Sequence, residues 1–269
     1  MTRLDRRIVR ARFGAAAGNY DAEAVLQAEV QARLLERLEL LGFTPQRVLD
    51  LGAGTGRALK PLSRAYPKAR LTAADLAPGM LREAYRKRPR FRRVNFAAGA
   101  GEALPFADRS FEMVFSNLML QWCPEPDPVL VEVRRVLRGQ GVFLFTTLGP
   151  DTLRELRAAW AAVDDHDHVH PFMDMHDIGD ALVRAGFVEP VMDVERLTVT
   201  YEDVRTLMQD LRSIGARNAS SERPRGLMGP RRLAAVEQTY ERFRRDGRLP
   251  ATYEVVYGTA WTPLDLPRR

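Results

Sequence analysis

Short apolar runs alternate with segments of helical spacing over the middle of the chain. The five runs are Arg47–Leu51, Arg70–Ala74, Arg93–Ala97, Glu112–Ser116 and Gly141–Thr147. Helical spacing fills the intervals at Ala58–Tyr66, Gly79–Lys87 and Pro128–Leu137. Such alternation predicts a parallel sheet covered by helices on both faces. Ligands of these sheets bind outside the carboxyl ends of the strands, so chemistry is expected at that edge.

The pattern changes on either side of this region. An amphipathic helix is expected over Ala22–Leu41, and the small-residue segment before it, which ends near Tyr20, is expected to fold over a ligand as a lid. Downstream, helices are expected at Asp151–Val163, with Asp151 as the N-cap, and at Asp174–Gly186.

Two further strands bring the predicted total to seven. They are expected at Val188–Thr200 and Thr252–Trp261, and two helices, Val204–Ile214 and Arg231–Arg245, are expected between them. The expected organisation is a helical lid (1–42), an α/β core (43–200), a helical insertion over the ligand edge (201–250), a final core strand (251–262) and a tail (263–269).

A glycine-rich turn follows the first strand, in the order Gly52-Ala53-Gly54-Thr55-Gly56. Glycine allows positive φ and lets a ligand lie against the main chain, and the helix start adds unpaired N–H groups. Asp50, just before the turn, suits an ammonium group. Asp75 follows roughly 20 residues later, where a carboxylate can bind both ribose hydroxyls. An ammonium, a ribose and no phosphate indicate S-adenosylmethionine; the alternative is a glycine turn in an unrelated α/β domain.

Composition and charge limit the partners and the cellular compartment that we expect. The net charge is +6 and the basic residues are scattered, which argues against a nucleic-acid stripe. Clusters at Arg86–Arg93, Arg223–Arg232 and Arg242–Arg248 permit an acidic protein partner. The single Cys123 excludes an internal disulfide and fits the cytoplasm, and no apolar run is long enough to span a membrane. The histidine-rich loop Asp164–His170 is not expected to bind metal, because alternating histidines do not set a tetrahedral geometry.

Several motifs resemble those of class I S-adenosylmethionine-dependent methyltransferases, namely Leu49–Gly56, Asp75–Leu81 and Glu102–Phe106. A second set is similar to the malonyl-acyl-carrier-protein O-methyltransferases of biotin synthesis. That set comprises Arg12–Asp21, Ser116–Cys123, Phe145–Leu148, Leu153–Asp164, His168 with Phe172, and Leu211–Ala216. The resemblance runs from about Arg7 to Trp261 and implies the Rossmann-like, seven-stranded fold of that class.

The resemblance also implies a reaction: methylation of the free carboxylate of a malonyl thioester, carried by acidic acyl carrier protein or by coenzyme A. The ester would prime pimeloyl synthesis, with S-adenosylhomocysteine as the other product and the enzyme acting as a monomer. A carboxylate is already ionised at neutral pH, so the reaction suits a chain without an evident acid–base pair. Neither nucleic acid nor membrane is expected as a partner.

The residues implied for the site fall into two groups. Cofactor contacts are expected from Tyr20, Asp50, Gly52, Ala53, Gly54, Gly56, Asp75, Leu76, Met80, Glu102, Ala103 and Asn117. Tyr20, Gln121, Trp122 and His168 are expected in the pocket wall and lid, and Arg154 and Arg212 at the substrate carboxylate or the pantetheine phosphate. A solvated helix face is the alternative for Arg154.

One position departs from the class, and one other family competes. Ala100 stands where an Asp commonly binds the adenine amino group, so backbone groups or Glu102 must hold the adenine. Thr152–Arg157, His168–Phe172 and Leu249–Tyr257 also resemble the methyltransferase-like arginine hydroxylase that assists assembly of respiratory complex I. A cofactor-binding module without catalysis is the third alternative.

Overall fold

A single seven-stranded sheet organises the chain. The computed structural model describes residues 5–264, except 91, 124, 167, 170 and 215–228. The strands are β1 (Arg47–Leu51), β2 (Arg70–Asp75), β3 (Val94–Ala98), β4 (Phe111–Ser116), β5 (Leu137–Leu148), β6 (Val188–Tyr201) and β7 (Leu249–Trp261). Their order is β3-β2-β1-β4-β5-β7-β6. The first five run parallel, and β7 lies antiparallel between β5 and β6. The predicted seven-stranded α/β sheet is confirmed.

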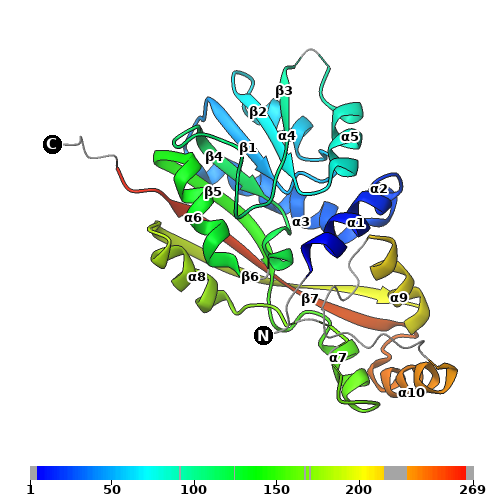
Figure 1. Ribbon diagram of the computed structural model, residues 1–269. Helices are drawn as coiled ribbons and strands as arrows, with labels where there is room; N and C mark the ends of the chain where they lie inside the picture. The colour runs from blue at the N-terminus through cyan, green and yellow to red at the C-terminus, as the bar shows by residue number, and fades with distance from the viewer. Residues whose placement is uncertain are drawn as a thin grey trace.

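Helices cover both faces of this sheet (Figure 1). They are α1 (Arg6–Ala16), α2 (Tyr20–Glu23), α3 (Val25–Glu36), α4 (Leu59–Ala65), α5 (Pro78–Lys87), α6 (Pro126–Val136), α7 (Arg154–Ala161), α8 (Met175–Arg184), α9 (Val204–Ser213) and α10 (Pro230–Tyr240). Short 3₁₀ segments are η1 (Arg37–Leu41), η2 (Leu120–Trp122) and η3 (Glu241–Phe243). Side chains of α3, α4 and α5 pack on one face, and side chains of α6 and α8 on the other.

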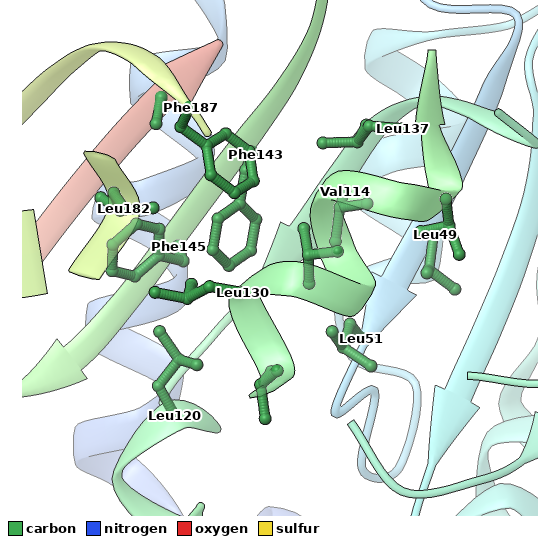
Figure 2. Close-up of a cluster of buried hydrophobic side chains, with 14 of the residues drawn as sticks. Leu49, Leu51, Val114, Leu120, Leu130, Leu137, Phe143, Phe145, Leu182 and Phe187 are labelled. Atoms are coloured by element: carbon green, nitrogen blue, oxygen red, sulfur yellow. The ribbon is translucent and has the colours of Figure 1, made fainter. Parts of the chain in front are cut away.

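The alternation of side chains along β5 shows why both faces are buried. Val142 and Leu144 point into the cluster under α3 and α4, whereas Phe143 and Phe145 point into the cluster under α6 and α8. Figure 2 shows the two phenylalanines among side chains of α6, α8 and β4. Their rings stack with centroids 4.6 Å apart. Because all four side chains are fully buried, this central strand must be apolar on both sides.

The antiparallel pair of β6 and β7 extends past the carboxyl end of β5. Leu148 of β5 pairs with Val255 of β7, but the β6–β7 pairing continues to Tyr201 and Leu249. A separate apolar cluster covers this extension, with side chains from α7, α9 and α10. In Figure 1 the three helices lie around this end of the β6–β7 pair. The helices inserted before the last strand therefore pack beside the ligand edge of the sheet.

Two local expectations were wrong. The helix expected over Ala22–Leu41 is broken at Ala24, whose ψ of 57° is not helical, and its last turn is the 3₁₀ segment η1. Asp151 does not cap α7, because Leu153 takes a left-handed conformation (φ 56°) and the helix starts at Arg154. The Asp151 carboxylate instead accepts hydrogen bonds from Arg196 at 2.9 and 3.1 Å.

Parts of the predicted organisation lie outside the described residues. These are most of the arginine cluster Arg223–Arg232, the end of the Leu211–Ala216 motif and residues 265–269 of the tail. Within the described part of the chain, no helix is both long enough and apolar enough to cross a membrane.

Candidate active site

One cavity of about 480 Å³ opens at the carboxyl ends of the parallel strands. Its walls come from the turns after β1, β2 and β3, the segment after β4, the lid helices α1 and α2, α7 with the loop that follows it, and α9. The volume is within the range of small-molecule sites. The structure thus brings the strand ends that the sequence singled out to one place.

The glycine turn forms the floor of the cavity. Gly52, Gly54 and Gly56 all have positive φ, between 55° and 77°. A Cβ on Gly52 would lie 2.5 Å from Cγ of Met119, so a side chain there is excluded. A Cβ on Gly54 would meet no atom within 4 Å, so this backbone faces open space in the cavity wall. A ligand can therefore lie directly on the main chain at Gly54.

Two acidic side chains flank the turn. Asp75 lines the cavity; its carboxylate accepts hydrogen bonds from the amides of Gly54 (2.9 Å) and Ala77 (2.8 Å). Burial raises the pKa of Asp75 despite these bonds. Asp50, at the end of β1, is 3% exposed, and its Oδ2 has no hydrogen-bond partner among the described residues. Burial is the main cause that raises the pKa of Asp50 to about 8, and the negative charge of Asp75 adds to it. A buried acceptor without a partner fits an ammonium group.

Most of the expected cofactor contacts line the cavity. They are Tyr20, Gly52, Gly54, Asp75, Leu76, Met80, Glu102 and Asn117. Asp50, Ala53, Gly56 and Ala103 do not line it. The Ala53 amide donates to the carbonyl of Ala74, and the Gly56 and Ala103 amides close local turns onto Ala53 and Ala100. These three residues therefore shape the turns and do not present free amides.

The side chain of Asn117 is fixed by the protein itself. Its Nδ2 donates to the Gln27 carbonyl at 3.1 Å, and its Oδ1 accepts from the Thr146 hydroxyl at 2.8 Å. The next residue, Leu118, is a non-glycine residue with φ of 50° and also lines the cavity. Held backbone strain of this kind is common at functional sites.

Helices α1 and α2 close the cavity from above the glycine turn. Phe13 of α1 packs edge-on against Tyr20 (6.2 Å between ring centroids) and Trp122 (5.1 Å). Burial and the nearby Asp75 raise the pKa of Tyr20 far above its ordinary value, so the phenol stays protonated. Arg6 forms an ion pair of 2.6 Å with Glu102, which lies in the turn expected to hold the adenine.

The expected substrate residues separate into two groups. Gln121, Trp122, His168 and Arg212 line the cavity. Arg154 does not; its side chain is 57% exposed and pairs with Glu155 at 3.3 Å. The position of Arg154 therefore does not support the expected contact with the substrate and fits the solvated face of a helix.

Several lining residues escaped the sequence analysis. Arg6, Gln27 and Leu118 line the cavity, and the Oε1 atom of Gln27 is buried without a partner among the described residues. Nothing local marks Gln27, because it lies in a helix of ordinary amphipathic pattern. The sequence does not distinguish Arg6 from other exposed arginines, because its pairing with Glu102 depends on where α1 packs.

Two other candidate chemistries receive no support from the geometry. Burial is the main cause that raises the pKa of Cys123 to about 12, and the negative charge of Glu102 adds to it. The thiol therefore stays protonated and unreactive. In the part of the chain that the structure describes, no group of three or more His, Cys, Asp or Glu side chains is placed to hold a metal ion.

Comparisons with known proteins agree with this architecture. The profile of the methyltransferase domain family matches residues 49–145. The YcgJ protein of Bacillus subtilis has a similar structure (TM-score 0.62, 16% identity, covering 87% of this chain and all of that one). A phosphoethanolamine N-methyltransferase of Haemonchus contortus, solved with S-adenosyl-L-methionine, has a TM-score of 0.54 at 18% identity, covering 86% of this chain and 52% of that one. The fold and the glycine-rich site define an S-adenosylmethionine-dependent methyltransferase.

Curated relatives narrow the class further. The malonyl-[acyl-carrier protein] O-methyltransferase of Laribacter hongkongensis is 53% identical over 98% of this chain and 92% of its own length. The protein of the same name from Halorhodospira halophila is 53% identical over 99% of this chain and 91% of its own length. The chain belongs to the malonyl-[acyl-carrier protein] O-methyltransferase family.

Proposed function

We propose that the protein methylates the free carboxylate of malonyl-acyl carrier protein. The observation that carries this proposal is that Gly54 and Asp75, on the cofactor side, line the same cavity as His168 and Arg212. A nucleophile held by the latter two residues would share this cavity with a ligand bound on the glycine turn. Family membership supports the malonyl thioester as the substrate.

The residues present fit S-adenosylmethionine. Asp75 lines the cavity and would bind the ribose hydroxyls. Asp50 does not line the cavity, so its buried oxygen without a partner would favour the ammonium through its charge and not by direct contact. The backbone of Gly99–Glu102 lines the cavity where Ala100 replaces the usual Asp, so main-chain groups hold the adenine while Glu102 pairs with Arg6. When bound, the cofactor supplies a methyl group on a sulfonium, which passes to a carboxylate oxygen and leaves a thioether.

The protein's contribution is alignment and exclusion of water. The malonyl carboxylate is ionised at neutral pH, so no side chain has to remove a proton from it. Tyr20, Phe13 and Trp122 cover the cavity, and Arg212 brings a positive charge to it from the last turn of α9. Holding the reacting atoms in line in a dry site accounts for most of the acceleration expected of such a displacement.

We further propose that the enzyme acts in the cytoplasm, which its single cysteine fits. The competing proposal, hydroxylation of a protein arginine, receives no support from the relatives named above. The stretch Thr152–Arg157, which suggested it, has a structural role. Glu155 accepts hydrogen bonds from the amide and the hydroxyl of Thr252, and Arg157 donates to the carbonyl of Thr152.

The test is transfer of labelled methyl from S-adenosylmethionine to malonyl-acyl carrier protein, with acetyl-acyl carrier protein as the control. Methyl ester on the malonyl form alone is the expected result. Arg212→Ala should raise the KM for the malonyl substrate about tenfold or more, because a charged hydrogen bond is lost. Arg154→Ala is the matched control and should leave KM within about twofold. Tight cofactor binding without transfer to either carrier would refute the proposal.

A further inference from the structure

His168 is held in the cavity wall from two sides. It lies in the loop between α7 and α8, and its side chain is 17% exposed. Its Nε2 lies 2.8 Å from Oδ1 of Asp164, four residues earlier. Its ring also stacks on Trp160 of α7, with centroids 3.5 Å apart and an angle of 12° between the planes. Trp160 is only 4% exposed and therefore cannot move easily. The hydrogen bond to Asp164 thus fixes one edge of the imidazole, and the stacking on Trp160 fixes one face of it.

Asp164 is built to accept hydrogen bonds. Its side chain is 8% exposed, and Oδ1 also accepts from the amide of His166 at 3.0 Å. Burial alone would raise the pKa of Asp164, but the bonds from His168 and His166 outweigh it and hold this pKa below its ordinary value. Arg232 of α10 lies 4.0 Å from Oδ2. The carboxylate is therefore ionised at neutral pH, and Nε2 of His168 must be the donor.

This arrangement determines which ring atom is left for a ligand. With Nε2 bound to Asp164, only Nδ1 remains, and it has no hydrogen-bond partner among the described residues. A fixed imidazole with one nitrogen unused, in the wall of a cavity, is the arrangement by which a second carboxylate orients a histidine toward a ligand.

We propose that Asp164 is a positioning residue that holds His168 with Nδ1 toward the substrate, so that the imidazolium donates a hydrogen bond to the malonyl carboxylate. The inference rests on the proposed function and assigns a specificity role within the same site. Arg212 reaches the cavity from α9, so the histidine is an independent donor from another element.

The proton on Nδ1 stays where it is throughout the reaction. His168 binds the carboxylate most strongly before methyl transfer, because the carboxylate loses charge as the new C–O bond forms; the contact therefore lowers KM and does not raise kcat. The product ester has no charge and accepts a weaker hydrogen bond, so the same contact favours release of product. An acetyl thioester has no carboxylate and gains nothing from His168.

The experiment compares two numbers for each variant: KM for malonyl-acyl carrier protein, and the inhibition constant of acetyl-acyl carrier protein. His168→Ala should raise KM about ten- to hundredfold, and Asp164→Asn about three- to tenfold, since a charged hydrogen bond is lost or misaligned. The acetyl inhibition constant and the Kd for S-adenosylmethionine should stay within about twofold. His168→Gln, which keeps an N–H donor, should recover part of the loss.

A second His–Asp pair provides the matched control. Nδ1 of His176 lies 2.7 Å from Asp174, but the His176 side chain is 83% exposed and does not line the cavity. His176→Ala should change neither the KM for malonyl-acyl carrier protein nor the inhibition constant of acetyl-acyl carrier protein.

Three outcomes would overturn the inference. An unchanged KM in His168→Ala shows that the ring does not bind the carboxylate. A parallel rise in KM and in the acetyl inhibition constant shows that Asp164 and His168 only hold the loop. Absence of transfer by the wild-type protein refutes the proposed function, and the inference falls with it. If Asp164→Asn does not fold, the His168→Ala and His168→Gln pair decides.

Discussion

At the scale of single residues, Asp50 has an unusual requirement. It ends a buried strand, lies close enough to Asp75 to be affected by its charge, and has one oxygen without a hydrogen-bond partner in the described structure. A buried carboxyl group without a cation is more stable when protonated, and its pKa is raised to about 8. An ammonium group would reverse this preference, because an opposite charge favours the ionised form.

We therefore expect binding of S-adenosylmethionine to release a proton from Asp50 below pH 8. The free protein binds this proton and the complex does not, so affinity should rise with pH, by up to about tenfold per unit, until pH approaches 8. Calorimetry in two buffers of different ionisation enthalpy measures the release. Asp50→Asn should abolish it and weaken binding. Identical heats in both buffers for the wild-type protein would show that Asp50 does not lose a proton on binding.

At the scale of elements, one side chain of α2 links the lid to the glycine turn and to α5. The Asp21 carboxylate accepts a hydrogen bond of 2.5 Å from Thr55 in the glycine turn and pairs with Lys87 of α5 at 2.7 Å. Arg57 donates to the Asp21 carbonyl at 2.8 Å. Burial opposes ionisation of Asp21, but the bonds from Lys87 and Thr55 prevail and lower its pKa. This attachment is thus present above the ordinary pKa of 3.8 and is lost only as pH falls through the lowered value.

Removing the charge of Asp21 should loosen the lid without unfolding the core. We expect Asp21→Asn to weaken S-adenosylmethionine binding about two- to fivefold, mainly through faster dissociation, because partly exposed ion pairs contribute up to about 1 kcal/mol each. Stopped-flow displacement measures the dissociation rate. The control is Glu241→Gln, which breaks an exposed pair with Arg244 away from the cavity. Equal rates in wild-type and Asp21→Asn protein would mean that the charge of Asp21 is not needed to hold α2.

The central strands depend on one glycine. Gly258 of β7 lies opposite Phe145 of β5, and a Cβ there would lie 2.2 Å from the phenylalanine ring. We expect Gly258→Ala to lower the free energy of unfolding by about 1–3 kcal/mol through overpacking. Gly179→Ala in α8, where a Cβ meets nothing within 4 Å, should instead raise it by about 0.5–1 kcal/mol. Denaturant unfolding measures both; a neutral Gly258→Ala would show that Phe145 can move aside.

The elements themselves were largely predictable from sequence, because their signals are local. The continuous apolar run of β5 and the glycine turn after β1 indicate strand, turn and helix without knowledge of the rest. The wrong predictions arose where tertiary contacts prevail over local preference. Asp151 has the side chain of an N-cap, but Arg196, which is distant in sequence, binds it, and Leu153 adopts a conformation that favours glycine.

At the scale of the whole molecule, the site depends on convergence that no local pattern encodes. Asp75 and the glycine turn could be predicted because they follow consecutive strands. The pairing of Arg6 with Glu102 depends on how the lid folds onto the sheet edge. His168 and Asp164 are only four residues apart, but the position of this pair in the cavity wall depends on the tertiary fold. Arg154 and Arg212 look alike in sequence, and only the packing of α7 and α9 places one outside the cavity and the other in its wall.

The charge of the molecule suggests how a carrier-bound substrate is recognised. The net charge is +6, and acyl carrier protein is acidic, so long-range attraction should speed their encounter. This attraction is screened at high salt, because the Debye length shortens from about 10 Å at 0.1 M to about 3 Å at 1 M. A small thioester such as malonyl-pantetheine presents the same reacting group without the charges of the carrier.

We therefore expect kcat/KM for malonyl-acyl carrier protein to fall several-fold between about 0.05 and 0.5 M salt, while kcat stays constant. The value for malonyl-pantetheine should change much less, since only its single carboxylate is screened. Initial rates are measured with both substrates across the same salt series, so that malonyl-pantetheine serves as the control for malonyl-acyl carrier protein at each salt concentration. If the two substrates lose activity in parallel, the basic surface does not guide the carrier, and salt acts on the cavity itself through Arg212 or the Asp21 attachment of the lid.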